Sequence, residues 1–243
     1  MKNQMKKFRR VFNLILIFLV VAPILGCSKG KVGNGNVISQ ERQVENFSGI
    51  KVSEGIDLML TQGDSVRVVV ETDENLMELL RTDVSDSVLH IHFAKNVKRA
   101  KKRKVSVSFI DLERLVVNSG AKANTSEILS LNDFQVEVSS GGDANLELDA
   151  QNINASTSSG AGMTLKGKAE NLKASASSGS DLQAGDLIAN HVDASASSGG
   201  DVLIHAVKSL KANASSGGDV SYKGNPETED VSTSSGGDVK KQE

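Results

Sequence analysis

Hydrophobic and polar residues alternate through most of the chain, which is the pattern of β-strands with one buried face. Between residues 118 and 240 the alternation comes in blocks separated by Ser-Gly turns. The turns are marked by glycines spaced 21, 19, 19, 20, 18 and 19 residues apart: Gly120, Gly141, Gly160, Gly179, Gly199, Gly217 and Gly236. A period that varies slightly predicts stacked coils whose corners tolerate insertions, and excludes a coiled coil.

One unit of about 19 residues cannot bury its own apolar row, but stacked units can. With coils about 4.8 Å apart, like residues form columns along the axis. Small residues such as Ala155, Ala174 and Ala194 would let opposing walls approach closely. Glycine supplies the positive φ of a tight corner, and the preceding serine can bond to the local backbone. We therefore predict an all-β fold, a parallel β-helix with coils of about 19 residues.

Residues 44–117 carry a less regular version of the same alternation. Strands are predicted at five segments, residues 50–52, 56–60, 66–70, 88–93 and 105–110. A short helix is predicted over residues 75–81, with Thr72 or Asp73 as its cap. We expect these elements to begin a single domain over residues 44–240, which the regular repeats of residues 118–240 complete.

The first 26 residues have the composition of a secretory signal. Five basic residues precede an apolar run over 11–25 that is too short to span a bilayer comfortably. The run ends Leu25-Gly26-Cys27, which resembles a bacterial lipobox and predicts that Cys27 is acylated. An uncleaved anchor or an ordinary signal peptide is the alternative. Residues 27–43 are rich in Gly, Asn, Lys and Gln and predict a flexible tether.

Charge and cysteine content narrow the class of partner. Without residues 1–26 the chain has 23 Lys and Arg against 30 Asp and Glu, a net charge near −7. This argues against nucleic acid, and against anionic lipid as a general partner. Cys27 is the only cysteine, so an exported chain forms no internal disulfide and the thiol fits an acylation site. The acyl group would attach the protein to a membrane.

An aspartate recurs after the Ser-Gly turns, at Asp143, Asp181, Asp201, Asp219 and Asp238. Carboxylates about 4.8 Å apart repel one another unless something compensates, and Ca²⁺ could do so. The alternative is that each aspartate accepts hydrogen bonds at its own corner and stays solvated, because Asp is an ordinary turn residue. The nine-residue Ca²⁺ repeat is absent and the period here is about twice as long, which favours the solvated aspartates over a Ca²⁺ site.

Two other groups of side chains suggest chemistry. A basic run, Lys98, Arg99, Lys101, Lys102, Arg103 and Lys104, could form a loop that binds phosphate-rich glycolipid or another anionic envelope polymer. The alternative is a solvated loop between two strands. His90 and His92 share one strand face and could supply half a metal site, but no third ligand is placed by the sequence, which favours exposed strand histidines.

No catalytic residues are predicted. A polysaccharide lyase or hydrolase needs clustered acids, or a base with Arg or Lys, usually in an aromatic-lined groove. From residue 135 onward Tyr222 is the sole aromatic residue, and the repeats carry Ser and Asp almost uniformly. This uniformity favours a scaffold over an enzyme.

The order of motifs resembles one family. Residues 47–52 (FSGIKV) and 55–63 (GIDLMLTQG), the segment 89–91, the Ser-Gly-Gly-Asp turns and the closing residues 222–226 are together similar to the head GIN domain of auto-transporter adhesin-like lipoproteins, common in Bacteroidetes. The resemblance covers residues 44–240. It implies a right-handed, pectin-lyase-like β-helix without transferred catalytic residues.

The function that we predict is a non-enzymatic, lipid-anchored β-solenoid of the cell envelope, acting in adhesion or envelope interactions with a glycan or protein ligand. The alternative is a carbohydrate-active enzyme or glycan-binding module on the same fold. Export to the outer membrane is expected, and the periplasmic side is favoured because no acidic patch follows Cys27.

Overall fold

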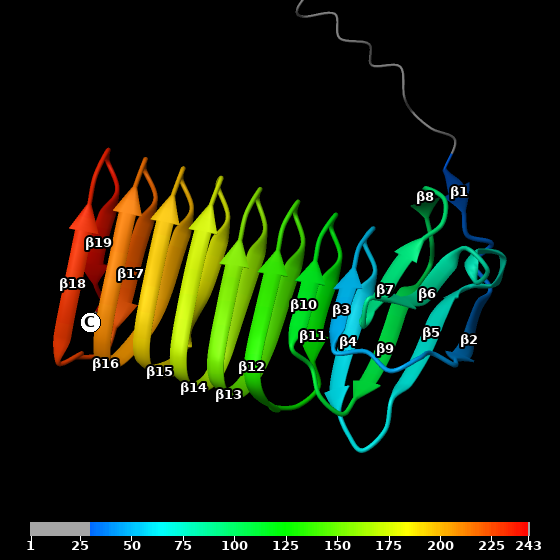
Figure 1. Ribbon diagram of the computed structural model, residues 1–243. Coiled ribbons are helices and arrows are strands. Elements are labelled where there is room, and N and C mark those ends of the chain that lie inside the picture. Colours follow the sequence, from blue (N-terminus) through cyan, green and yellow to red (C-terminus); the bar gives the residue numbers. More distant parts are fainter. Residues whose placement is uncertain (1–29, 243) are drawn as a thin grey trace, which may run out of the picture.

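The computed structural model describes residues 30–242, and about two thirds of them belong to strands (Figure 1). The solenoid proper contains ten strands: β10 (Arg114–Val117), β11 (Lys122–Thr125), β12 (Leu129–Val138), β13 (Asp143–Thr157), β14 (Gly162–Ser177), β15 (Asp181–Ser197), β16 (Asp201–Ser215), β17 (Asp219–Lys223), β18 (Thr228–Thr233) and β19 (Asp238–Lys241). They stack in parallel, which confirms the predicted all-β parallel solenoid.

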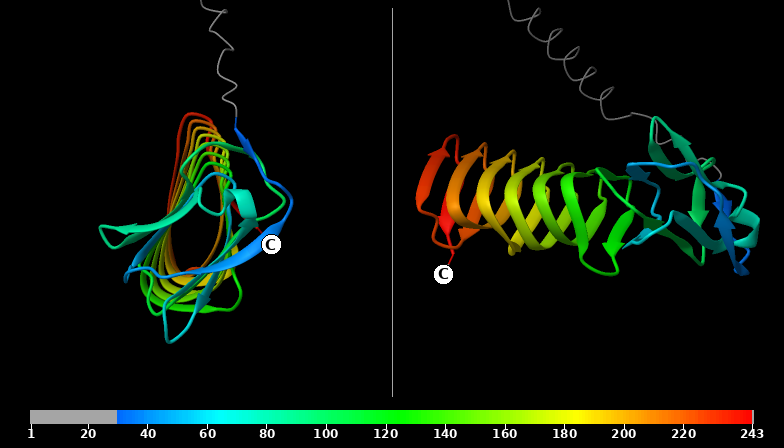
Figure 2. Two further views of the ribbon diagram at one scale, coloured as in Figure 1. Left: turned by 90° about the vertical axis from the view of Figure 1, so that its right-hand side faces the viewer. Right: turned by 60° about the horizontal axis from the view of Figure 1, so that its bottom comes forward.

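Each coil has two flat sides. Face A is formed by the strand segments before the Ser-Gly turns (β10, β18 and the second halves of β12–β16), and face B by those after the turns (β11, β17, β19 and the first halves of β13–β16). The register follows the sequence period, with Asn152 opposite Asn171 and Asn171 opposite His191. Seen from the N-terminal end, the coils superpose into a flattened tube (Figure 2).

The inward columns form the core. On face A the alanines Ala155, Ala174, Ala194 and Ala212 lie in register and are completely buried. On face B larger residues continue from coil to coil, such as Met163 opposite Leu182. Because burial of apolar area scales with the surface removed from water, each coil gains its stability from the coils on either side.

The Ser-Gly corners are joined to one another by backbone hydrogen bonds. The serine was expected to bond locally, but its own backbone adopts a φ of 49–55° at all seven corners, next to the positive-φ glycine. At several of these corners the serine carbonyl accepts a hydrogen bond from the preceding coil: the N–H of Gly120 donates to Ser140 and that of Gly141 to Ser159, each at 3.2 Å. Hydrogen bonds between corners therefore support a conformation that serine rarely adopts.

One extra residue in β15 and one residue fewer in β16 explain the spacings of 20 and 18. The pairing of β14 with β15 shifts between Thr164 and Lys166, and that of β15 with β16 shifts between Ala184 and Ile188. A bulge absorbs the additional residue and the columns return to register. The corner spacing is therefore 20 across the coil that contains β15 and 18 across the shorter coil that contains β16, where the pairing shifts again between Ala189 and His191.

The N-terminal part contains the remaining elements: β1 (Lys31–Val32), β2 (Val37–Arg42), β3 (Gly49–Val52), β4 (Asp57–Gln62), β5 (Arg67–Asp73), the 3₁₀ helix η1 (Glu74–Leu76), β6 (Leu80–Ser85), β7 (Val88–Phe93), β8 (Val97–Arg99) and β9 (Arg103–Phe109). Their spatial order differs from the chain order. Strand β3 lies between β7 and β10, and β4 lies between β9 and β11. The chain therefore enters the stack at its second layer and fills the first layer later.

Antiparallel strands close this end of the solenoid. Strand β5 pairs with β9, β2 pairs with the other edge of β5, and β6 pairs with β7. A stack of parallel strands would otherwise end in an open edge that could pair with another chain. The N-terminal part is therefore a cap as well as the first coils.

Two expectations for this region were wrong. The stretch expected to be a flexible tether contains two paired strands, since β1 pairs with β8 and β2 pairs with β5. These strands are held by backbone hydrogen bonds and contain few apolar residues, so their sequence does not show the alternation of a buried strand. The helix expected over 75–81 is one 3₁₀ turn followed by β6. Leu76, Met77 and Leu80 are buried with helix-like spacing, but Leu80 pairs with Phe93 as a strand residue.

The last coil closes the C-terminal end with polar residues. In register, the inward column passes from Leu210 to Glu229 and from Tyr222 to Lys241. The Tyr222 hydroxyl donates to the Glu229 carboxylate at 3.1 Å. Burial, followed by the hydrogen bond and the negative charge of Glu229, raises the pKa of Tyr222.

Candidate functional site

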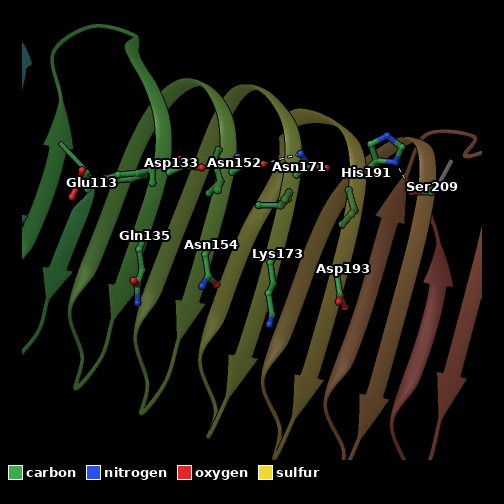
Figure 3. Close-up of a pocket in the computed structure, with 14 residues that line it drawn as sticks. Glu113, Asp133, Gln135, Asn152, Asn154, Asn171, Lys173, His191, Asp193 and Ser209 are labelled. Atoms are coloured by element: carbon green, nitrogen blue, oxygen red, sulfur yellow. Dashed lines mark hydrogen bonds between the residues drawn. The ribbon is translucent and has the colours of Figure 1, made fainter. Parts of the chain in front are cut away.

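A groove with a volume of about 660 Å³ runs along face A, across strands β12 to β16 (Figure 3). Its floor is made by the buried column Phe134, Ile153, Leu172 and Val192. Two polar rows line it, one from Asp133 to Ser209 and one from Gln135 to Asp193. The rows are parallel because residues two apart on one strand point to the same side.

The first row is a hydrogen-bonded ladder. The Asn171 Nδ2 donates to Asn152 Oδ1 at 2.8 Å, and Asn152 Nδ2 donates to Asp133 Oδ1 at 2.6 Å. The other oxygen of Asp133 accepts from Asn132 Nδ2 at 3.1 Å. A chain of amides that ends on a carboxylate is polarised in one direction, and this fixes the side-chain orientations along three coils.

His191 continues the row. Its Nδ1 lies 2.8 Å from the hydroxyl of Ser209, and its Nε2 lies 3.8 Å from the carboxylate of Glu170. Glu170 also accepts from Asn190 at 2.6 Å and faces Lys208 at 3.8 Å. These contacts hold the imidazole at the surface, between a hydroxyl and a carboxylate.

The second row contains amide, ammonium and carboxylate side chains on successive coils. Gln135, Asn154, Lys173 and Asp193 stand in register on successive coils and point into solvent (Figure 3). Lys173 is the one cationic residue among those that line the groove, apart from His191. The row thus offers an amide, an ammonium and a carboxylate in a line about 4.8 Å apart.

The groove gathers carboxylates and a lysine, the residue types that the enzyme alternative requires. The distance between the two carboxylates argues against a glycosidase pair. Asp133 and Asp193 are three coils apart, about 14 Å at the spacing between strands. That exceeds the roughly 5 to 9.5 Å between the two carboxyl groups of a glycosidase. Glu113 is a nearer neighbour of Asp133, but both oxygens of Asp133 already accept amide hydrogens.

The structure stacks the predicted aspartates on face B. Asp181, Asp201 and Asp219 are in register, and Asp238 follows. Asp143 stands apart, since Lys122 and Gly162 flank it. Desolvation, followed by the charges of Asp219 and Asp181, raises the pKa of Asp201.

Most of these aspartates find partners on their own strands rather than at the corner amides. Asp143 accepts from Asn145 at 3.0 Å and Asp181 from Gln183 at 2.6 Å. Asp238 pairs with Lys240 at 2.6 Å, which lowers the pKa of Asp238. Within residues 30–242 no three His, Cys, Asp or Glu side chains are grouped so that they could hold a metal ion.

The basic run belongs partly to strands rather than to a free loop. Lys98 and Arg99 lie in β8, and Arg103 and Lys104 begin β9. The buried carboxylate of Asp73 accepts from the backbone N–H of Gly35 at 2.6 Å and of Lys101 at 2.7 Å. Burial alone would raise the pKa of Asp73, but the N–H donors together hold it below its ordinary value.

His90 and His92 share the exposed side of β7, as predicted, and line a shallow hollow with Lys51 and Glu54. Cys27 and the predicted signal segment lie outside the described residues. Among the residues that are described, no helix is long and apolar enough to span a membrane.

The groove and its ladder are the functional feature that sequence reasoning missed. The signal was present, because Asp133, Asn152 and Asn171 repeat at the 19-residue period. What the sequence could not show is that this row forms the wall of a hollow. The bend between face B and face A places it there.

The fold and the groove define a class of protein: a parallel β-solenoid that displays an ordered polar surface. The family model described as "Putative auto-transporter adhesin, head GIN domain" matches residues 46–226, and this chain belongs to that family. This confirms the resemblance seen in the sequence.

Solved structures show the same fold. A "putative adhesin" from Bacteroides fragilis is 21% identical, with a TM-score of 0.81, and the match covers 88% of this chain and 100% of that one. A "putative lipid binding protein" from Parabacteroides distasonis is 20% identical, with a TM-score of 0.75 and the same coverage. A "putative adhesin" from Parabacteroides merdae is 22% identical, with a TM-score of 0.69, over 88% and 99% of the two chains. No curated protein matches the sequence.

Proposed function

We propose that this protein is a non-enzymatic interaction module of the cell envelope, attached to a membrane by acylated Cys27, and that it engages its ligand through the groove on face A. The observation that carries the proposal is the ladder from Asp133 through Asn152 to Asn171, which orders polar groups along several coils. A preorganised row of donors and acceptors lowers the entropy cost of binding an extended polar ligand.

The family name supports adhesion as the class of function, and the groove supports a polar polymer as the class of ligand. Hydroxyl-rich glycans and extended peptides both present donors and acceptors in a repeating line. The groove combines such a row with the buried apolar floor at Ile153 and Leu172.

The test is binding of the purified protein to intact cells and to envelope polysaccharide fractions. The charge reversal Lys173→Glu changes the centre of the groove, and we expect it to weaken binding at least tenfold. Lys166→Glu is the matched control, because Lys166 is also exposed but lies on face B. Equal binding of the two variants would contradict the assignment of the groove.

Two further measurements test the other parts of the proposal. Release of new reducing ends or unsaturated sugars from any bound polysaccharide would show turnover and overturn the non-enzymatic assignment. Mass spectrometry of the N-terminal peptide tests acylation, for which the Cys27→Ser variant is the control. Protease treatment of intact cells tests the side of the outer membrane, and protection is expected on the periplasmic side.

A further inference from the structure

The basic run divides into two groups when its contacts are followed. Residues 95–104 contain seven Lys and Arg and no Asp or Glu. Lys102 and Arg103 are used within the fold: Lys102 Nζ lies 2.8 Å from Glu71, and the Arg103 guanidinium donates to the Val97 carbonyl and lies over the ring of Phe93. Their charges stabilise the cap.

Lys98, Arg99 and Lys101 instead face solvent. No side-chain hydrogen bond or ion pair holds Lys98 or Arg99 within residues 30–242. In the described part of the chain, the Lys101 ammonium reaches only the Gly35 carbonyl, at 3.4 Å. Their backbone is nevertheless fixed, because the buried Asp73 binds the N–H of Lys101. A rigid backbone thus carries cations that pair with no carboxylate among residues 30–242.

This group lies beside the proposed anchor. Strand β8 pairs in parallel with β1, so that Val97 stands opposite Lys31 and Arg99 opposite Val32. Lys31 is exposed and follows Cys27 by four residues, a distance of at most about 14 Å for an extended chain. Figure 1 shows β1 and β8 side by side, at the opposite end of the molecule from β18 and β19.

We propose that the β1–β8 surface, defined by Lys31, Lys98, Arg99 and Lys101, rests on the membrane that holds the anchor and binds the phosphate groups of anionic lipid headgroups. The proposal rests on the acylation of Cys27 given above. A membrane is favoured over a soluble polyanion because the anchor keeps this surface within about 14 Å of the lipid. Exposed Val32 adds an apolar side chain to the same surface.

The net charge near −7 does not oppose this arrangement. Charges are screened over about 8 Å at physiological salt, so a headgroup senses the β1–β8 surface and not the distant aspartates on face B. Each Lys or Arg near an anionic leaflet contributes roughly fivefold to the partition constant. The chain is therefore acidic overall and basic where it meets the membrane.

The experiment uses the acylated full chain, purified in detergent and reconstituted into vesicles of phosphatidylcholine alone or with 30% phosphatidylglycerol. Lysines are acetylated briefly and read by mass spectrometry. We expect Lys31, Lys98 and Lys101 to react at least threefold more slowly on the anionic vesicles, and Lys173 to react equally on both. Raising the salt to 0.5 M should remove the difference.

Variants test which charges cause the protection. The triple variant K98E/R99E/K101E should leave Lys31 equally reactive on both kinds of vesicle. The control triple K166E/K168E/K211E makes the same charge change on exposed solenoid positions and should retain the protection of Lys31.

The anchor and the basic surface fail in different ways. A protein that does not float with phosphatidylcholine vesicles lacks the anchor. If such a protein floats with the anionic vesicles and the K98E/R99E/K101E variant does not, membrane binding by the β1–β8 surface is still supported. If it floats with neither kind of vesicle, the proposal for the β1–β8 surface is overturned. Flotation with equal lysine reactivity on both vesicles overturns the surface but not the anchor. Protection by soluble dextran sulfate without protection by anionic vesicles assigns the surface to a polymer and also overturns the proposal.

Discussion

The N-terminal cap (residues 30–109) and the solenoid (residues 114–241) share the same stacked columns but are stabilised differently. The cap buries large side chains such as Ile50, Leu58 and Phe109, and its strands pair out of chain order. The solenoid buries alanine columns and pairs each strand with the next coil. The cap therefore depends on contacts that are distant in sequence, and the solenoid depends on its neighbours.

This difference has a consequence for where function resides. A regular stack can carry a repeated surface, such as the ladder on face A, since every coil supports the same geometry. An irregular cap can hold unique features, such as the buried Asp73 carboxylate and the basic strand β8. The proposed ligand groove accordingly lies on the regular solenoid, and the proposed membrane surface lies on the irregular cap.

The largest effect is expected from truncation in the cap. Phe109→Ala removes a completely buried ring and should lower the free energy of unfolding by about 3–5 kcal/mol. The adjacent Ile110→Ala is the control, because Ile110 is 58% exposed and should change stability by less than about 0.5 kcal/mol. Urea unfolding measures both, and similar losses would contradict the assigned orientation of β9.

The buried carboxylate is the next target. Asp73→Asn should cost about 2–4 kcal/mol, because the amide cannot accept from all of the surrounding N–H groups. The pKa of Asp73 is lowered on folding, so its contribution is present above pH 3.8 and is lost as the pH falls through the lowered value. The difference between wild type and variant should therefore shrink below about pH 4. The control is Asp83→Asn at an exposed position of β6, which should change stability by less than about 0.5 kcal/mol at pH 7.

The corners of the solenoid give a smaller effect. A Cβ at Gly218 would lie 2.5 Å from the backbone nitrogen of Ser197, so Gly218→Ala should destabilise by about 1–3 kcal/mol. Ala161 occupies the same corner position in another coil. Ala161→Gly should cost only about 0.5–1 kcal/mol, mainly from backbone entropy. Thermal unfolding compares the two variants. Equal losses of stability would contradict the prediction that the Gly218 corner lies closer to the preceding coil than the Ala161 corner does.

The smallest effect is expected in the aspartate column. The pKa of Asp201 is raised on folding, so its ionisation above that pKa destabilises the fold. Asp201→Asn should stabilise by about 0.2–0.5 kcal/mol at pH 7 in low salt, given the screening of exposed charges. The gain should vanish below pH 3.8. A rise in melting temperature of the wild type with millimolar Ca²⁺, reversed by EDTA, would instead show that the column binds the cation.

Parts of the fold follow directly from residue patterns. The Ser-Gly period predicted the stack, and alternation predicted β3, β4, β5, β7 and β9 to within a few residues. The hydrophobic pattern gave wrong predictions where backbone pairing with a distant strand determines the local structure. Strand β2 has four exposed residues and is held by the edge of β5, and Leu76, Met77 and Leu80 pack under the cap without forming an α-helix.

By itself the sequence determined that this is a parallel solenoid with small residues inside and polar residues outside, because a period of about 19 and an alternation of two leave one way to bury the apolar columns. Tertiary structure decided which polar row becomes the wall of the face A groove, in which order the cap strands stack, and that β8 lies against β1 beside the proposed anchor. These outcomes depend on bends and on pairings between strands that are distant in sequence, and the local composition of a segment specifies neither.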